Sequence, residues 1–214
     1  MRLKFLRLLV FIAFNSLTNI YSEVEVPYVS DFENEESYVS GSSLSGDWTT
    51  TDDSVIITNA EAYSGTQSVC ITSANPENII SLSFNPSGNP TLFVDYYMQL
   101  TASTLPELPS FTQPETTSVI AFQPYLSDSG EWVFLDGNGS GGGVWHATGK
   151  TVPLNGSDRT GWHRITLRFD LLSNSWDAYI DGNLLAVDLG FVEALVASSE
   201  AINIYGNNLG ACRT

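Results

Sequence analysis

The strongest structural signal in this sequence is the segment "WHRITLRFDLLSNSWDAYIDGNLL", residues 162–185. Apolar and polar residues alternate along 162–170 and again along 175–181, which is the period of a β-strand with one buried face. The short polar stretch between the two runs predicts an antiparallel hairpin. Asp181 and Gly182 predict a further tight turn, because Asp-Gly readily adopts the positive φ angles that such a turn needs.

The alternation also divides the side chains of this hairpin between two faces. Asp177 and Tyr179 share the outer face with Arg164 and Arg168, so we expect cross-strand charge and cation–π pairs worth about 0.2–1 kcal/mol each. The residues predicted to face the core are Ile165, Leu167, Phe169, Trp176, Ala178 and Ile180.

The rest of the chain repeats this pattern of short strands separated by turn residues. With 17 Gly, 9 Pro and 15% charged residues, the 214-residue chain is typical of a turn-rich β protein. Only 192–200 has helical character. About 10–13 short strands at regular spacing predict an all-β, antiparallel two-sheet sandwich or jelly roll in one domain, residues 23–214. The other predicted strands cover 54–58, 67–73, 78–84, 91–101, 118–125, 131–137, 144–154 and 201–206.

The first 22 residues have the layout of a secretory signal. A basic start, the apolar run "LLVFIAF" and a polar end predict cleavage near Ser22 and a mature protein that is extracellular, periplasmic or on the cell surface. An N-terminal membrane anchor is the alternative, but the run is shorter than the roughly 20 residues that span a bilayer. We expect no membrane span in the mature chain.

The chain is strongly acidic, with 8 Lys and Arg against 24 Asp and Glu and a formal charge of −16. Loss of residues 1–22 removes three basic and no acidic residues, which gives 5 − 24 = −19. Such a surface repels nucleic acid and anionic lipid, because phosphate binding needs clustered Lys and Arg. Neutral sugars, cations or plain solubility in salt are compatible with it.

Two cysteines, Cys70 and Cys212, both lie in apolar, strand-like contexts. Export would allow a disulfide between them, but such contexts are equally ordinary for buried free thiols, and we expect the latter. A zinc site is excluded, because two cysteines and two distant histidines lack the spacing of zinc ligands.

The 161–191 segment resembles the laminin-G-like, concanavalin A-type jelly-roll superfamily, lectins and glucanases among them. Segments 31–48, 62–69 and 93–100 are similar to secreted bacterial members. Such domains close with a strand carrying an acidic pair, whereas this chain stops at "LGACRT". Either the sequence is a fragment or its fold closes differently. The positions that carry the resemblance in the hairpin are Trp162, His163, Ile165, Leu167, Phe169, Tyr179, Ile180, Asp181 and Gly182.

The resemblance allows tests for enzymatic activity. Glucanases of this superfamily carry a Glu-x-Asp-x-x-Glu strand, and the nearest stretch here, 33–37, has the wrong spacing. Related lyases use a Gln-x-His strand, but Gln99 lacks its histidine. His146 and His163 have no motif-placed nucleophile, and His163 shares the face of Ile165, which favours a core or strand-end histidine over a general base. We therefore expect no catalytic residues.

A sugar site is the first candidate for ligand binding. Asp95, Tyr97 and Gln99 share one strand face, and aromatic rings beside carboxylates and amides are typical of sugar binding. The alternative is that these aromatic rings belong to the core. The aromatic residues on neighbouring predicted strands are Tyr125, Trp132 and Trp145.

A calcium site is the second candidate. Asp136, Asn138 and Ser140 lie at i, i+2 and i+4 before a glycine, like the first half of an EF-hand loop, although its closing acid is missing. A plain glycine-rich turn explains the same residues and is favoured. Asp31 and Glu33 form another candidate pair, because related β-sandwiches bind a structural calcium near such an N-terminal Phe-Glu.

These observations favour a secreted, non-catalytic binding or adhesion module whose ligand is a glycan, with calcium as a structural ion. A divergent polysaccharide hydrolase or lyase is the alternative. A purely structural surface or assembly module, whose edge strands pair with neighbours, is the third interpretation.

Overall fold

The structure is a computed structural model. It describes residues 24–25, 28–50, 55–71, 79–85, 88–99, 124–126, 130–151, 161–192 and 200–205. The elements assigned in these ranges are β1 (Val24–Glu25), the 3-10 helix η1 (Asn34–Glu36), β2 (Trp48–Thr50), β3 (Val55–Thr58), β4 (Ser68–Ile71), β5 (Ile79–Asn85), β6 (Thr91–Gln99), β7 (Pro124–Leu126), β8 (Glu131–Gly137), β9 (Gly143–Thr151), β10 (Trp162–Asp170), β11 (Ser175–Ile180), β12 (Asn183–Gly190) and β13 (Glu200–Tyr205).

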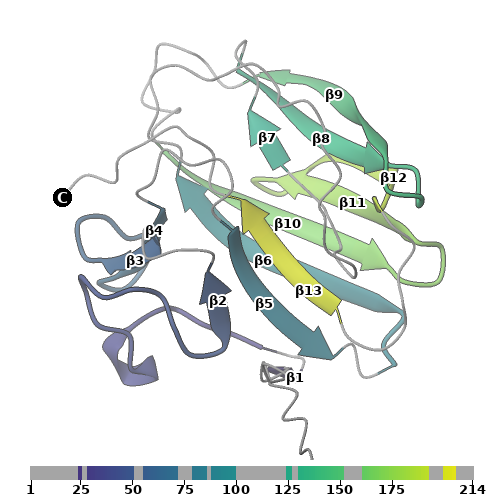
Figure 1. The fold of residues 1–214 in the computed structure, drawn as a ribbon. Coiled ribbons are helices and arrows are strands. Elements are labelled where there is room, and N and C mark those ends of the chain that lie inside the picture. The colour runs from purple at the N-terminus through teal and green to yellow at the C-terminus, as the bar shows by residue number, and fades with distance from the viewer. Residues whose placement is uncertain are drawn as a thin grey trace, which may run out of the picture.

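Strand β10 lies inside one of the two four-stranded sheets, whose order is β12–β11–β10–β6 (Figure 1). It pairs antiparallel with β6 on one side and with β11 on the other. Leu167 therefore lies opposite Val94 in β6 and opposite Ala178 in β11. The predicted hairpin is confirmed, and residues 171–174 form its turn.

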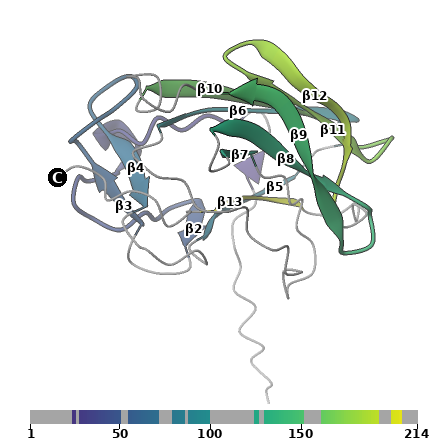
Figure 2. The same cartoon turned by 90° about the horizontal axis from the view of Figure 1, so that it is seen from above.

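The second four-stranded sheet is built on β5, and Figure 2 shows it across the molecule from β6 and β10. β2 and β13 pair antiparallel with β5, whereas β1 pairs with it in parallel. The β7–β8–β9 sheet and the β3–β4 hairpin are the remaining sheets of the described residues. The protein is thus an all-β, predominantly antiparallel sandwich, which confirms the predicted fold class.

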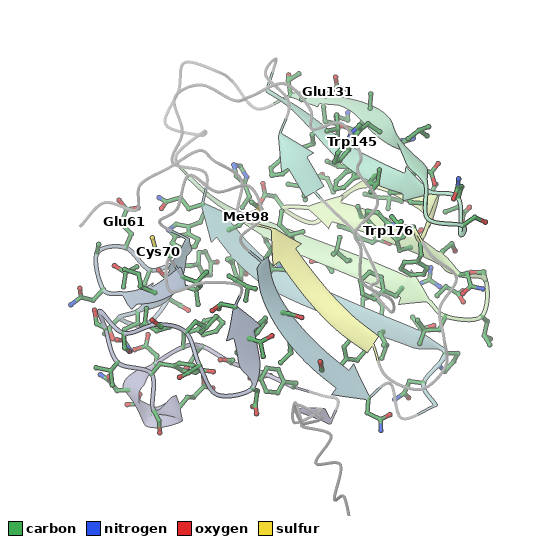
Figure 3. All side chains as sticks on the ribbon, in the orientation of Figure 1. Glu61, Cys70, Met98, Glu131, Trp145 and Trp176 are labelled. Atoms are coloured by element: carbon green, nitrogen blue, oxygen red, sulfur yellow. The ribbon has the colours of Figure 1, made fainter. Side chains whose placement is uncertain are left out.

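The main core fills the space between these sheets. Ile165, Leu167 and Phe169 of β10 are fully buried, as their alternation predicts. Trp176 is buried with them (Figure 3), and its Nε1 donates to the carbonyl oxygen of Gly190 at 3.0 Å, so that its polar atom is satisfied. The other fully or nearly fully buried members of this core are Leu82, Phe84, Leu92, Trp132, Phe134, Ala178, Ile180, Ala186, Leu189 and Phe191.

The outer face of the hairpin confirms one predicted cross-strand pair and corrects another. Arg168 donates from Nη1 to Asp177 Oδ2 at 2.9 Å, directly across the β10–β11 ladder. Arg164 instead pairs with Asp95 on β6. The hairpin pattern indicates only one partner of β10, whereas β6 flanks the same strand on its other side.

The cysteine prediction is wrong, because Cys70 on β4 (Figure 3) is disulfide-bonded and is not a free thiol. Cys212, the one other cysteine in the sequence, lies outside the described residues. Apolar context does not distinguish a buried thiol from a buried disulfide, since both remove sulfur from water.

Several predictions fall on residues that are not described. These are the signal segment 1–22, most of the 192–200 helix, and 118–123 of one predicted strand, of which Pro124–Leu126 forms β7. Within the described ranges, no helix has both the length and the apolar character needed to cross a membrane.

Truncation of the β10 core tests this packing. We expect Leu167→Ala to lower the free energy of unfolding by about 2–5 kcal/mol, because it leaves a cavity between the sheets. Leu172→Ala is the matched control. Leu172 lies in the adjoining turn and is 81% exposed, so its truncation should change stability by less than about 0.5 kcal/mol. Urea unfolding measures both, and equal effects would contradict the assigned core.

Candidate functional site

The outward face of β6 and β10 places aromatic and charged side chains next to one another. Antiparallel register sets Asp95 opposite Thr166, Tyr97 opposite Arg164, and Gln99 opposite Trp162. Alternation along β6 sends Val94 and Tyr96 to the core, so Asp95 and Tyr97, which share the other strand face as predicted, point outward.

Asp95 and Arg164 form a bidentate ion pair on this face. Arg164 Nε donates to Asp95 Oδ1 at 2.9 Å and Nη2 donates to Oδ2 at 2.5 Å. The Thr166 hydroxyl donates to Oδ1 at 2.8 Å. The Arg164 hydrogen bond is the main cause that lowers the pKa of Asp95 below its usual 3.8. The pair is therefore fixed and charged at neutral pH.

Two tyrosines stack beside this ion pair. The rings of Tyr63 and Tyr97 have centroids 3.5 Å apart at an interplanar angle of 12°, and Trp162 meets Tyr63 edge-on at 6.1 Å. Tyr63 is 51% exposed and Tyr97 38%. Their mutual hydrogen bond is the largest cause that raises the pKa of Tyr97. Together with Asp95 and Arg164, these three aromatic residues are called the tyrosine face below.

Sequence reasoning missed Tyr63, Trp162 and Arg164 as site residues. Tyr63 lies in the loop between β3 and β4, more than 30 positions before Tyr97 in the sequence. No period relates that loop to the β6 ladder, so only the folded chain shows that the rings meet. Trp162 and Arg164 were assigned to the fold pattern of the hairpin, although they face outward on β10.

The other predicted sugar-binding residues do not join the tyrosine face as a group. Trp132 is 3% exposed and belongs to the core, where it contacts His163 edge-on at 5.7 Å. Trp145 packs against Leu135 and Val192 on the β8–β9 side (Figure 3). Tyr125 lies in β7, opposite Val133, and Gln99 ends β6 opposite Trp162.

Two side-chain oxygens of the predicted calcium loop accept hydrogen bonds from backbone N–H groups of the protein. Asn138 Oδ1 accepts from the backbone N–H groups of Ser140 at 2.9 Å and Gly142 at 3.0 Å. Asp136 Oδ1 accepts from Gly190 N–H at 2.7 Å. Donors directed at these oxygens stabilise a tight turn, which agrees with the plain-turn interpretation that the sequence favoured.

The carboxylates of Asp31 and Glu33 also accept hydrogen bonds from within the chain. Asp31 Oδ1 accepts from the backbone N–H of Glu33 at 3.2 Å. Glu33 accepts from the backbone and hydroxyl of Thr66 and from the backbone of Gln67. These bonds lower the pKa of Glu33 below its usual 4.5. Among the described residues, no group of three or more His, Cys, Asp or Glu could hold a metal.

His163 and Asp181 form a close pair that has the form of a catalytic dyad. His163 Nδ1 lies 2.8 Å from Asp181 Oδ2, while Asp181 Oδ1 accepts from Arg164 N–H at 2.9 Å. Asp181 has a φ of 51° and begins the turn into β12. The dyad therefore fixes this turn to β10, and the side chain of His163 is only 12% exposed.

Comparison with known proteins gives no family assignment. No family model matches the chain, and no curated protein matches it by sequence. Among solved structures, it is similar to the binding domain of the paraclostridial mosquitocidal protein 1, with a TM-score of 0.44 and 14% identity over 76% of this chain and 40% of that one. The chain thus spans less than half of the length of that protein.

Two further solved structures show weaker likeness. The Trypanosoma cruzi (T. cruzi) calreticulin globular domain is 20% identical over 68% of this chain and 61% of its own, with a TM-score of 0.39. Domain 4 of AbnA, a GH43 extracellular arabinanase from Geobacillus stearothermophilus solved with arabinotriose, is 14% identical over 84% and 92%, with a TM-score of 0.38. These values are too low to assign a function from any of the three proteins.

Chelation tests the calcium prediction directly. Because Asp136 Oδ1, Asn138 Oδ1 and both carboxylate oxygens of Glu33 accept hydrogen bonds from within the chain, we expect the melting temperature to be the same in a chelator and in added calcium. Differential scanning calorimetry measures both conditions. A melting temperature that falls in chelator and recovers with calcium would instead support the predicted ion.

Acid titration tests the carboxylates of this region. Asp95 has a folded-state pKa below its usual 3.8, so its charged form stabilises the fold above that pH and this contribution is lost as the pH falls through the lower value. We expect the stability of Asp95→Asn to fall less steeply below pH 3.8 than that of the wild type. Urea unfolding at several pH values measures the free energy of unfolding of both proteins. If this free energy falls equally steeply with pH in both, the ionisation of Asp95 does not stabilise the protein.

Proposed function

We propose that this protein is an exported, non-catalytic carbohydrate-binding module of the laminin-G-like, concanavalin A-type kind, and that the tyrosine face binds the sugar. The observation that carries the proposal is the exposed Tyr63–Tyr97 stack beside the fixed Asp95–Arg164 pair. Export is supported by the disulfide at Cys70, because such bonds persist in oxidising compartments.

The chemistry of this face suits a sugar ring. A pyranose or furanose has an apolar C–H face and a rim of hydroxyls. The exposed tyrosine rings supply flat apolar surface at low entropic cost, since an aromatic side chain has few rotatable bonds. Asp95 and Arg164 supply acceptors and donors whose positions are already set. The formal charge of −16 disfavours polyanionic glycans, so we expect a neutral sugar.

The tyrosine face also explains why binding is proposed in place of catalysis. Its one carboxylate, Asp95, is held by Arg164 and Thr166, which lowers its pKa and makes it a poor proton donor at neutral pH. A hydrolase or lyase remains the competing proposal. It is distinguished by products, because a binding module releases neither reducing ends nor unsaturated sugars from a polysaccharide.

Glycan-array screening followed by calorimetry with the best neutral glycan tests the proposal. We expect Tyr97→Ala to weaken binding at least about tenfold, as for an exposed aromatic anchor, and Tyr97→Phe to retain most of the affinity because the stack is kept. Leu184→Ala is the control. Leu184 lies on β12 at the far edge of the same sheet and is 50% exposed.

Two outcomes would contradict the proposal. A Leu184→Ala variant that loses as much affinity as Tyr97→Ala would place the ligand elsewhere on the sheet. Release of reducing ends or unsaturated products from a polysaccharide panel by the purified wild-type protein would replace the binding module with an enzyme.

A further inference from the structure

We infer that Glu33 and Gln67 are positioning residues for the sugar-binding face, because together they fix the loop that presents Tyr63. This inference rests on the proposed function for its ligand, but its structural part can be tested without one. Neither residue belongs to the tyrosine face. Both act on the 59–67 loop between β3 and β4.

Glu33 holds the end of this loop through both of its carboxylate oxygens. Its Oε1 accepts from the backbone N–H groups of Thr66 at 2.6 Å and Gln67 at 2.9 Å. Its Oε2 accepts from the Thr66 hydroxyl at 2.5 Å. A carboxylate that receives three donors from two consecutive residues fixes the local backbone, since charge-assisted hydrogen bonds are about twice as strong as neutral ones.

Gln67 completes the connection in the opposite direction. Its side chain is 5% exposed, and Nε2 donates to the carbonyl oxygens of Phe32 at 3.1 Å and Tyr38 at 3.3 Å. Five hydrogen bonds therefore join residues 32–38 to residues 66–67. We call this set of bonds the Glu33 clamp.

The backbone on both sides of the clamp has positive φ angles. Phe32 has a φ of 61°, which is unfavourable for a bulky residue. Gly65 has a φ of 69°, and a Cβ there would lie 2.2 Å from Glu33 Oε1. The strained Phe32 and the missing side chain at position 65 together let the carboxylate approach the loop backbone. Such local strain is typical of functional positions.

The clamp matters for Tyr63 because backbone pairing does not place this residue on the tyrosine face. β3 and β4 pair with each other in a sheet distinct from that of β6 and β10. Tyr63 lies three positions before Thr66 and crosses to the other sheet to stack on Tyr97. With the loop fixed at Thr66 and Gln67, the ring is held in its binding position before the sugar arrives.

Loss of the clamp should therefore lower affinity through Tyr63. If Glu33→Ala leaves the loop in its binding position for only a tenth to a third of the time, affinity falls about three- to tenfold. Glu33→Gln keeps one acceptor oxygen, so its glycan affinity should lie between that of Glu33→Ala and that of the wild type. Glu35→Ala, which removes the same charge from the exposed neighbouring turn, is the matched control and should bind normally.

A double-mutant cycle separates positioning from general destabilisation. In a Tyr63→Ala background, Glu33→Ala should cause no further loss of glycan affinity, because both changes act through the same ring. Calorimetry below the melting temperature of every variant gives the four affinities. Equal losses from Glu33→Ala with and without Tyr63, or no loss in either background, would overturn the inference.

A measurement without any glycan tests the Glu33 clamp independently of the proposed function. Stacking at 3.5 Å shifts the ring protons of Tyr63 and Tyr97 upfield in the NMR spectrum. We expect Glu33→Ala to reduce these shifts and Glu35→Ala to preserve them. If the wild type binds no glycan, the proposed function fails alone and the NMR result decides the clamp. Unchanged ring shifts in Glu33→Ala would then reject it.

Discussion

Strand β10 pairs with β6 on one side and with β11 on the other, and this double pairing fixes the register of the whole sheet. Its inward residues Ile165, Leu167 and Phe169 are fully buried, so the strand cannot slip by one position without exposing all three. The same fixed register determines what faces outward. Arg164 is held opposite Tyr97, and Thr166 opposite Asp95, because the core holds the alternate positions. The core and the candidate site are thus two sides of one ladder.

A ladder alone supplies only part of the tyrosine face. Tyr97 and the Asp95–Arg164 pair belong to it, but Tyr63 comes from a loop between strands of another sheet. The Glu33 clamp provides the connection that β-sheet hydrogen bonding does not. It joins residues 32–38 to the end of that loop. The backbone of this segment is strained at Phe32, where φ is 61°. The paired strands β6 and β10 therefore position Tyr97 and Arg164, whereas side-chain hydrogen bonds position the loop that carries Tyr63.

The sequence predicted those parts of the protein in which apolar and polar residues alternate along a strand. Alternation along 162–181 identified the hairpin and its buried residues. Alternation along 91–101 placed Asp95 and Tyr97 on one shared strand face. Each of these predictions depends only on local chain geometry. It did not identify Tyr63 or the partner of Arg164, since both depend on which distant segments become neighbours. Glu33 was predicted as a calcium ligand from its place beside Phe32 in the family pattern. Its carboxylate instead accepts hydrogen bonds from the backbone and hydroxyl of Thr66 and from the backbone of Gln67. Trp132 shows the same limit in reverse, because an aromatic residue in a strand has no local feature that separates core from surface.

We propose that a sugar binds where Tyr63, Tyr97 and Trp162 meet. Titration of the isotope-labelled protein with a neutral glycan identified by array, followed by NMR chemical-shift mapping, tests this most directly. We expect the largest shifts at the rings of these three residues and at the Arg164 guanidinium, with little change along β9. Shifts concentrated on β9 or on the Asp136 loop, with the tyrosine rings unchanged, would contradict it.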